Sequence, residues 1–415
     1  MNIFERVQVE QLRVRLAEKA RLLTIVAGPR QVGKTTLVRS VLDNQGSTQY
    51  VATDSDESRA EFSPASGGTL PSTGTPKNET WLVDQWQQAR QRAQQATAGF
   101  VFAVDEIQKI PRWSEVAKGL HDADRAVGLD LRVVLLGSSP LLMRKGLTES
   151  LAGRFETIPL SHWTFPEMHD AFGLTLDEYL YFGGYPGSAK YIRDEPRWRT
   201  YVRDSLIEPA IGKDIFQMER VDRQPLFREL FRLGCNYSGQ VLALNKMAPH
   251  LEEDGKKGHT NTLAHYLDLL AQAGLLVGLQ KYAGSKLRLR GSPPKFIALN
   301  NALMSVESGD DFATATHDRT QWGRVVETAV GAHLYNSLTA ECQLFYWSAG
   351  SEEVDFVLVK GRHITAIEVK SGRKRAHMRG FDAFEKAHGK CQRLIVGEGG
   401  VSLPEFFSYP ADHWV

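Results

Sequence analysis

The chain has 415 residues, more than one ordinary domain holds, so its length predicts two to four domains. Its 50 lysines and arginines nearly balance 49 aspartates and glutamates, so binding to nucleic acid would need local basic patches. The three widely separated cysteines lack metal-site spacing, the charged start of the chain is unlike a signal peptide, and no run approaches the roughly 20 apolar residues of a membrane span. We therefore expect a soluble, cytoplasmic protein with reduced thiols and no membrane contact.

The first predicted strand, "LLTIVA" at 22–27, leads through a glycine-rich loop into the helix-periodic "TTLVRSVLD". The loop fits G-x-x-x-x-G-K-[ST], in which glycines let backbone amides turn toward phosphate oxygens, the lysine reaches the terminal phosphates and the hydroxyl ligates magnesium. The alternative, a purely structural glycine turn, is disfavoured by the strand–loop–helix order. The predicted nucleotide-binding residues are Gly28, Pro29, Arg30, Gln31, Val32, Gly33, Lys34, Thr35 and Thr36.

The segment 62–80 is rich in Gly, Ser, Thr and Pro and predicts a loop within the domain, because the strand pattern resumes after it. The next apolar run, "GFVFAVDEIQKI", ends its strand in Asp105 and Glu106. Beside a phosphate-binding loop, we expect Asp105 to hold Mg²⁺ and Glu106 to polarise the attacking water. A pair of ordinary surface acids is the alternative.

The run "LRVVLLGSSP" predicts a further strand that ends at Ser138 and Ser139. In an open α/β sheet, ligands bind at the carboxyl ends of strands, so either hydroxyl is a candidate sensor of the γ-phosphate or of the attacking water; a helix N-cap is the alternative. Arg154 follows in a polar loop before another strand. It is a candidate arginine finger for a neighbouring subunit, or else a surface ion-pair partner of Glu149 or Glu156.

Beyond the predicted sheet, residues 166–222 are helical, are broken by glycines and predict a small lid beside the nucleotide. Residues 223–300 have the order helix, helix, helix, hairpin of a winged helix-turn-helix, with Asn261 as the expected cap of the third helix. The exposed start of that helix and the basic wing residues Lys281, Lys286, Arg288 and Arg290 would form a DNA-binding surface. The equal alternative is a winged helix that packs against protein.

A predicted helix and two predicted strands after residue 301 carry four further side chains of interest, Glu327, Asp355, Glu368 and Lys370. Glu368 and Lys370 share one face of a strand, and a hairpin would bring Asp355 beside Glu368. Two such carboxylates are ligands for a second Mg²⁺, and a lysine would steady water or a phosphate. We consider a working nuclease site, an inactive nuclease-like fold that binds DNA or partners, and coincidence. The basic residues Arg373, Lys374, Arg375 and Arg379 follow directly.

These motifs, together with "VFAVDEIQKIPRWSEVAKGL", "ESLAGRFE", "YFGGYPG" and "EVDFVLVKGRHITAIEVKSG", resemble the bacterial and archaeal AAA-type ATPases whose carboxy-terminal half is a domain of unknown function. The resemblance covers nearly the whole chain and implies a multidomain α/β fold. The expected domains are an AAA+ P-loop parallel-sheet core at 1–165, a helical lid at 166–222, a winged helix-turn-helix at 223–300 and an α/β domain similar to the PD-(D/E)xK nucleases at 301–415.

The same resemblance implies roles for the residues named above. It matches Walker A with Lys34 and Thr35, Walker B with Asp105 and Glu106, sensor 1 with Ser138 or Ser139, an arginine finger with Arg154, and the nuclease motif with Asp355, Glu368 and Lys370. Two features depart from the family pattern: sensor 1 is serine where asparagine is frequent, and a sensor-2 arginine is not evident.

The sequence therefore predicts an oligomeric ATPase, in a ring or another assembly, that uses ATP and Mg²⁺ to bind and remodel or translocate DNA, with branched DNA as one candidate. The first alternative is a nucleotide-dependent switch in signalling or defence that acts on a protein partner. The second is an ATP-regulated DNA nuclease. Salt-sensitive DNA binding separates the DNA-directed functions from the switch, and strand scission separates the nuclease from the motor.

Overall fold

The computed structural model describes residues 4–53, 77–138, 151–216, 221–247, 252–253, 256–257, 259–284, 292–372 and 379–415. The chain divides into two compact units, residues 1–160 and 161–415. The first unit ends five residues before the expected end of the ATPase core at 165. The segments expected as lid, winged helix and nuclease-like domain all belong to the second unit, and their division into three domains stays a prediction.

The first unit is built on a parallel sheet with the strand order β2-β3-β4-β1-β5. Its central strands are mostly apolar, and every residue of β3 is buried, as expected for a strand that helices cover on both faces. The strands are β1 (Leu23–Ala27), β2 (Thr48–Ala52), β3 (Phe100–Asp105), β4 (Leu131–Gly137) and β5 (Phe155–Pro159). The predicted alternation of strands and helices is confirmed.

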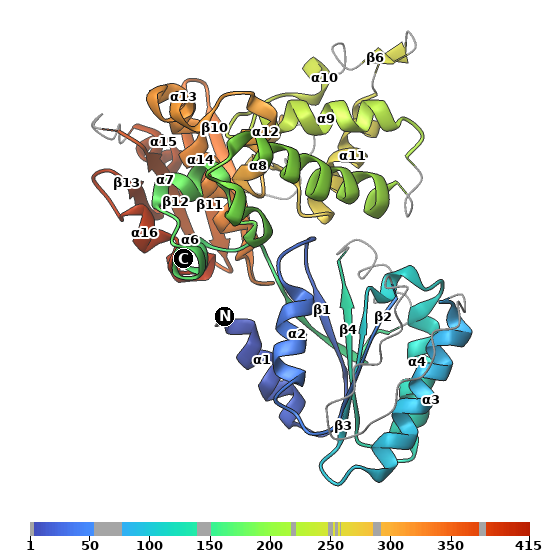
Figure 1. Cartoon of the computed structure of the whole chain (residues 1–415). Coiled ribbons are helices and arrows are strands. Elements are labelled where there is room, and N and C mark those ends of the chain that lie inside the picture. The colour runs from blue at the N-terminus through green and yellow to red at the C-terminus, as the bar shows by residue number, and fades with distance from the viewer. Residues whose placement is uncertain are drawn as a thin grey trace. The chain divides into compact units, whose positions relative to one another are not determined.

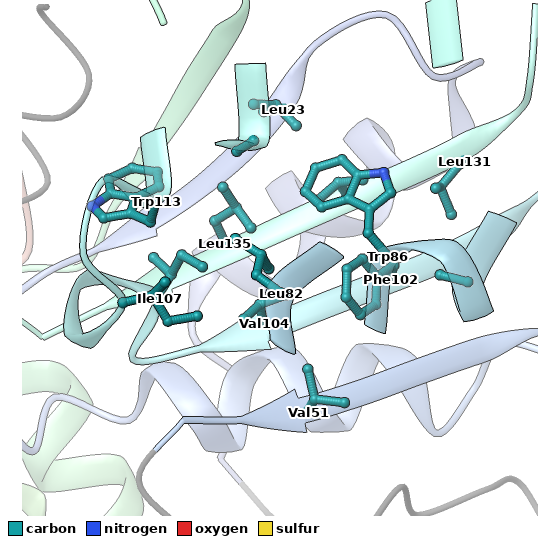
Figure 2. Close-up of a cluster of buried hydrophobic side chains, with 14 of the residues drawn as sticks. Leu23, Val51, Leu82, Trp86, Phe102, Val104, Ile107, Trp113, Leu131 and Leu135 are labelled. Atoms are coloured by element: carbon teal, nitrogen blue, oxygen red, sulfur yellow. The ribbon is translucent and has the colours of Figure 1, made fainter. Parts of the chain in front are cut away.

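Helices cover both faces of this sheet, with α1 and α2 on one side and α3 and α4 on the other (Figure 1). Their bounds are α1 (Val7–Ala17), α2 (Lys34–Leu42), α3 (Glu79–Gln95) and α4 (Trp113–Ala126), with a short 3-10 turn, η1 (Ile107–Lys109), after β3. Figure 2 shows the core beneath α3 and α4, where the fully buried Trp86 packs edge-on against Phe102 with ring centroids 5.7 Å apart. The indole N–H donates to Asp124 of α4 at 2.8 Å, which ties the two helices together.

The second unit begins with short helical elements. They are α6 (Phe165–Phe172), α7 (Leu176–Phe182), η2 (Pro186–Tyr191), α8 (Glu195–Val202), η3 (Arg203–Ile207) and η4 (Ala210–Ile215). Thr164 and Thr175 form capping boxes at the starts of α6 and α7. Phe182 packs edge-on against Trp198 of α8, and Tyr181 against Phe312 of a later helix. The segment expected as a lid therefore shares a core with the rest of this unit.

The predicted order of helices and hairpin follows, in the elements α9 (Gln224–Asn236), α10 (Leu244–Met247), α11 (Thr260–Gln272), β8 (Leu276–Leu279) and β9 (Lys295–Ala298). A small hairpin that the sequence did not predict, β6 (Glu252–Glu253) with β7 (Lys256–Lys257), precedes α11. α11 starts at Thr260 after His259, so the expected cap by Asn261 is wrong: Asn261 already lies within the helix. The winged-helix assignment itself stays a prediction.

A four-stranded sheet with the order β10-β11-β12-β13 forms the carboxy-terminal part. Its elements are α12 (Asn301–Ser308), α13 (Phe312–His317), α14 (Arg319–Asn336), β10 (Cys342–Ala349), β11 (Glu352–Lys360), β12 (His363–Lys370), α15 (Arg379–His388), β13 (Gln392–Gly397), α16 (Leu403–Phe406) and η7 (Ala411–Trp414). Residues 280–282, just after β8, bond to the edge strand β10: the Tyr282 amide donates to the Tyr346 carbonyl at 2.7 Å. An isolated bridge between Lys281 and Tyr346 thus connects the segment after β8 to this sheet, while β8 and β9 form a separate two-stranded sheet.

In the part of the chain that the structure describes, each helix is too short or too polar to cross a membrane.

Candidate functional site

The sheet order brings three loops of the first unit to one edge. β4 lies between β1 and β3, and because the three strands are parallel, their carboxyl ends meet. The predicted phosphate-binding loop follows β1, Asp105 ends β3 and Ser138 follows β4. Side chains that lie far apart in the sequence therefore converge at this edge.

Both motif glycines of the loop meet a requirement of the backbone. Gly33, which precedes α2, has φ 92°, a left-handed conformation that glycine adopts without a Cβ clash. At Gly28 a Cβ would lie 2.0 Å from the carbonyl oxygen of Leu160, so only glycine allows this close approach to the end of β5. Gln31 between them also has a positive φ of 60°.

Lys34 begins α2 and its side chain is buried inside the loop. The ammonium donates to the carbonyl oxygens of Gly28 at 2.9 Å and Pro29 at 2.7 Å. These bonds hold the positive charge beside the amino terminus of α2, where the helix dipole also favours an anion. The lysine is therefore placed where a phosphate group would be attracted.

The Thr35 hydroxyl donates to Oδ2 of Asp105 at 2.6 Å, and the Tyr50 phenol donates to the same oxygen at 2.5 Å. The other carboxylate oxygen accepts the backbone N–H of Glu106 at 2.8 Å. Burial and the neighbouring Asp105 charge raise the pKa of Tyr50, so this phenol stays protonated and remains a donor. A hydroxyl and a carboxylate in contact are the hard oxygen ligands that Mg²⁺ prefers, so these residues fit that ion.

Glu106 accepts hydrogen bonds from side chains that follow β2, β3 and β4. Its Oε2 accepts the Ser138 hydroxyl at 2.8 Å and the Gln108 amide at 2.6 Å, while Thr53 at the end of β2 donates to its carbonyl at 2.7 Å. The backbone of Glu106 has φ 54°, which is uncommon outside glycine and is found where surrounding structure enforces it, often at functional sites. Ser138 thus bonds to the acid of β3; Ser139, the other candidate sensor, lies outside the described residues.

Arg154 lies at the other edge of the sheet. It directly precedes β5, and its carbonyl accepts the amide of Leu23 at the start of β1, so the length of a five-residue strand, about 15 Å, separates it from the phosphate-binding loop of its own chain. Its guanidinium pairs with Asp122 of α4 at 2.8 Å. The expected alternative partner Glu156 is wrong, because Glu156 pairs with Arg15 at 2.7 Å, and Glu149 lies outside the described residues.

Sequence reasoning missed Tyr50 and Gln108. Tyr50 is in β2, whose carboxyl end meets the same edge as β3, and Gln108 is the polar residue in "EIQKI" directly after the acidic pair. The amide oxygen of Gln108 is buried, and among the described residues it has no hydrogen-bond partner. Both positions follow from the rule that strand ends form the site, once the strand order is known.

The carboxy-terminal candidates also converge, around a fifth residue that the sequence analysis missed. Lys370 donates to Glu368 at 2.8 Å, and Asp355 accepts the amide of Val369 at 2.8 Å. Lys295, the first residue of β9, pairs with Glu327 of α14, lies 3.7 Å from the Asp355 carboxylate and donates to the Asp355 carbonyl at 3.1 Å. Its one signal in the sequence is a charge at the start of the apolar run "KFIALN".

Burial dominates the electrostatics of this carboxylate cluster, which comprises Glu327, Asp355 and Glu368. Burial and the charge of Asp355 raise the pKa of Glu327 and that of Glu368 to about 7 each. Burial alone would lower the pKa of Lys295, but the charges of Glu327 and Asp355 outweigh it and raise that pKa, so Lys295 is a cation at neutral pH. Among the described residues, no group of three or more histidine, cysteine or acidic side chains is arranged to hold a metal ion.

Comparison with known families and structures identifies the first unit. Residues 20–169 match the family model of an AAA domain. The first unit has the fold of an AAA-type P-loop domain. Residues 173–311 and 322–405 match two domains of unknown function, DUF8612 and DUF4143, so these matches assign no activity to the second unit.

Two curated proteins and one solved structure are similar to this chain over most of its length. An uncharacterized protein of Mycobacterium tuberculosis and one of Mycobacterium bovis are each 28% identical over 356 residues, which cover 84% of this chain and 70% of the relative. A Walker-type ATPase of Pyrococcus abyssi superposes with a TM-score of 0.50 at 16% identity over 74% of this chain and 96% of the archaeal one. At this identity the likeness concerns the fold.

Proposed function

We propose that the AAA-type unit binds ATP with Mg²⁺ and hydrolyses it. The observation that carries this proposal is the contact of 2.6 Å between Thr35 and Asp105, beside the buried ammonium of Lys34. A phosphate-binding loop and a carboxylate at the neighbouring strand ends form the arrangement that phosphoryl transfer to water needs, because positioning and electrostatic stabilisation account for most of its catalysis.

Each side chain has a separate task in this proposal. Lys34 and the amides of residues 28–36 neutralise and orient the phosphates, and Glu106 accepts a proton from the attacking water. Ser138 and Gln108 hold the Glu106 carboxylate in place through its Oε2. Mg²⁺, held by Thr35 and Asp105, would supply positive charge against the phosphate oxygens.

We propose that Arg154 acts on the nucleotide of a neighbouring copy, and hence that the chain works as a homo-oligomer. Arg154 is at the sheet edge opposite its own phosphate-binding loop, so it cannot serve its own nucleotide. Its side chain is about a third exposed and is held by Asp122 at 2.8 Å. An exposed ion pair of this kind contributes little to stability, so the guanidinium can exchange Asp122 for a phosphate at small cost.

DNA is the substrate on which we propose that the ATPase acts. The order α9, α10, α11, β8, β9 is that of a winged helix, and Thr260, Asn261 and His265 at the start of α11 are exposed, where a recognition helix would present polar side chains to bases. The basic residues Lys286, Arg288 and Arg290, and likewise Arg373, Lys374 and Arg375, lie outside the described residues.

One observation favours the alternative, a nucleotide-dependent switch that acts on a protein partner. The β8–β9 hairpin is joined to the edge of the carboxy-terminal sheet through Tyr282 and Tyr346, and Lys295 of β9 is buried. A wing that packs on protein in this way has less surface left for a DNA groove. The hairpin then serves as an internal packing module.

An ATPase assay with no DNA and with single-stranded, duplex and four-way DNA tests both proposals, with Glu106→Gln as the matched inactive control. Basal hydrolysis that Glu106→Gln lacks supports the ATPase. Stimulation by DNA that weakens with salt supports the motor. Basal activity that no DNA changes, without salt-dependent affinity for DNA, favours the switch. Equal rates for the wild type and Glu106→Gln would contradict the assigned chemistry.

A further inference from the structure

The carboxylate cluster of the second unit already contains a cation. Lys295 extends from β9 between Glu327 of α14 and Asp355 of β11. We propose that Lys295 takes the place of a divalent metal ion in this cluster, so that the cluster fastens the β8–β9 hairpin to the sheet and is closed to metal. This inference concerns the second unit and does not depend on ATP hydrolysis by the first.

The ammonium of Lys295 is surrounded by the oxygens that a metal would need. It contacts Oε1 of Glu327, donates to the backbone carbonyl of Asp355 at 3.1 Å and lies 3.7 Å from Oδ1 of the same residue. An octahedral Mg²⁺ needs oxygens at about 2.0–2.1 Å and normally keeps several waters. Two cations cannot share that space, because their mutual repulsion in a poorly solvated site would cancel the attraction of the carboxylates.

The lysine is not free to swing away. Its side chain is only 6% exposed, and the ammonium lies 4.8 Å from the centre of the Phe356 ring. The backbone of Lys295 pairs with Leu279 of β8 and forms a bridge to Val241. These contacts fix the backbone of Lys295, and the burial of its side chain favours the position inside the cluster.

The other lysine of the cluster has a different place. Lys370 bonds to Glu368 at 2.8 Å on the face of β12, and it is a quarter exposed. It corresponds to the lysine expected to steady water or a phosphate. Lys295 instead lies between Glu327 and Asp355, and so shares Asp355 with the Asp355–Glu368 pair that the sequence analysis expected to hold Mg²⁺. Lys370 is therefore the natural control for Lys295: it carries the same charge in the same cluster without filling the cation position.

The consequence for function is that the nuclease-like site is inactive as folded. Removal of one partner from a buried pair of opposite charges is strongly destabilising, because the remaining charge is left uncompensated. Removal of the Lys295 ammonium should therefore leave the carboxylates of Glu327 and Asp355 without a cation. An added divalent ion can then bind between them.

Titration of the nucleotide-free, full-length chain with Mn²⁺, followed by electron paramagnetic resonance, tests the proposal. The wild type and Asp355→Asn should bind equal numbers of Mn²⁺. Lys295→Met should bind one more ion per chain, and Lys295→Met/Asp355→Asn should lose it. Lys370→Met should match the wild type. The wild type should also fail to nick supercoiled DNA in Mn²⁺.

Two results would overturn the proposal. The first is that Asp355→Asn binds one Mn²⁺ fewer than the wild type, or that the wild type cleaves DNA and Asp355→Asn does not. The second is a folded Lys295→Met that binds no more Mn²⁺ than the wild type. Lys295→Gln keeps the length and a donor, and it repeats the test if Lys295→Met is unstable. Should both variants unfold in metal-free buffer, recovery of circular dichroism with Mn²⁺ supports the proposal and failure to recover contradicts it.

Discussion

The hydroxyl of Thr35 donates to the carboxylate of Asp105 at 2.6 Å, across 70 positions of sequence. β1 and β3 are not neighbours, and β4 lies between them. This separation allows the phosphate-binding loop and the acidic pair to face each other, with Ser138 of the intervening strand beside Glu106.

Lys34→Ala should abolish ATP binding, and Glu106→Gln should bind ATP and stall. The first change removes the charge that meets the phosphates; the second keeps the shape of the side chain but removes the proton acceptor, a loss of about 10²–10⁴ in kcat. Binding of a fluorescent ATP analogue and release of phosphate measure the two effects. If Glu106→Gln hydrolyses ATP at the wild-type rate, the role of Glu106 as proton acceptor is wrongly assigned.

Gln108→Leu should lower kcat about tenfold, or about 1.4 kcal/mol in activation free energy, and leave the affinity for ATP within about twofold. Among the described residues, the carboxylate of Glu106 accepts from two side chains, the amide of Gln108 at 2.6 Å and the hydroxyl of Ser138 at 2.8 Å. The same amide of Gln108 also donates to Ser138. Steady-state kinetics with a parallel binding titration separate the two quantities. Ser138→Ala, which removes the other donor, should give the same pattern; a weakened affinity with unchanged kcat in either variant would refute this positioning role.

Arg154→Ala should lower turnover by about 10³ if the guanidinium reaches the nucleotide of a neighbouring copy. Mixed oligomers of Arg154→Ala and Lys34→Ala chains should then regain part of the activity, since each supplies what the other lacks. Asp122→Asn is the control, because it releases Arg154 from its ion pair while keeping the guanidinium. No rescue in a confirmed mixed oligomer would leave Arg154 as a surface ion pair.

Replacement of Lys286, Arg288 and Arg290, or of Arg373, Lys374 and Arg375, by alanine should weaken DNA binding for all sequences. Each lost phosphate contact should flatten the slope of log affinity against log salt by about 0.9 on duplex DNA. ATPase activity without DNA should be retained, since neither group belongs to the nucleotide site, and stimulation by DNA should fall. A wild type without salt-dependent DNA affinity would favour the switch.

His333 should make the second unit less stable in acid. Burial lowers the pKa of His333 to about 4, against an ordinary 6.5, and its Nε2–H donates to the Tyr409 carbonyl at 2.8 Å. In the unfolded chain His333 binds a proton more tightly than in the folded protein. The contribution of the neutral, buried His333 to the free energy of unfolding is therefore complete above pH 6.5 and is lost as the pH falls toward 4.

Urea unfolding at pH 7.5 and pH 5, followed by circular dichroism, measures this contribution. The free energy of unfolding of the wild type should fall by about 2 kcal/mol more than that of His333→Gln, whose amide keeps a donor but does not titrate. Equal falls in the two proteins would show that His333 does not contribute.

The candidate residues of the nucleotide site could be chosen from the sequence because their chemistry is local. Gly28, Gly33 and Lys34 stand in one loop, and Asp105 and Glu106 end one apolar run, so spacing and flanking strands suffice to select them. Tyr50 and Gln108 escaped notice because a lone polar residue acquires meaning only when the strand order places it beside the acids.

The alternation of strands and helices in the first unit, and the paired strands that carry Asp355 and Glu368, followed from the sequence by itself, because hydrophobic periodicity reports which face of an element is buried. Only the tertiary structure decided which charges meet. Arg154 pairs with Asp122 of α4, and Lys295 of the hairpin enters the carboxylate cluster, through contacts between elements 32 and 60 residues apart. An ion pair has no periodicity, since its partners are selected by packing and desolvation, which depend on the whole fold.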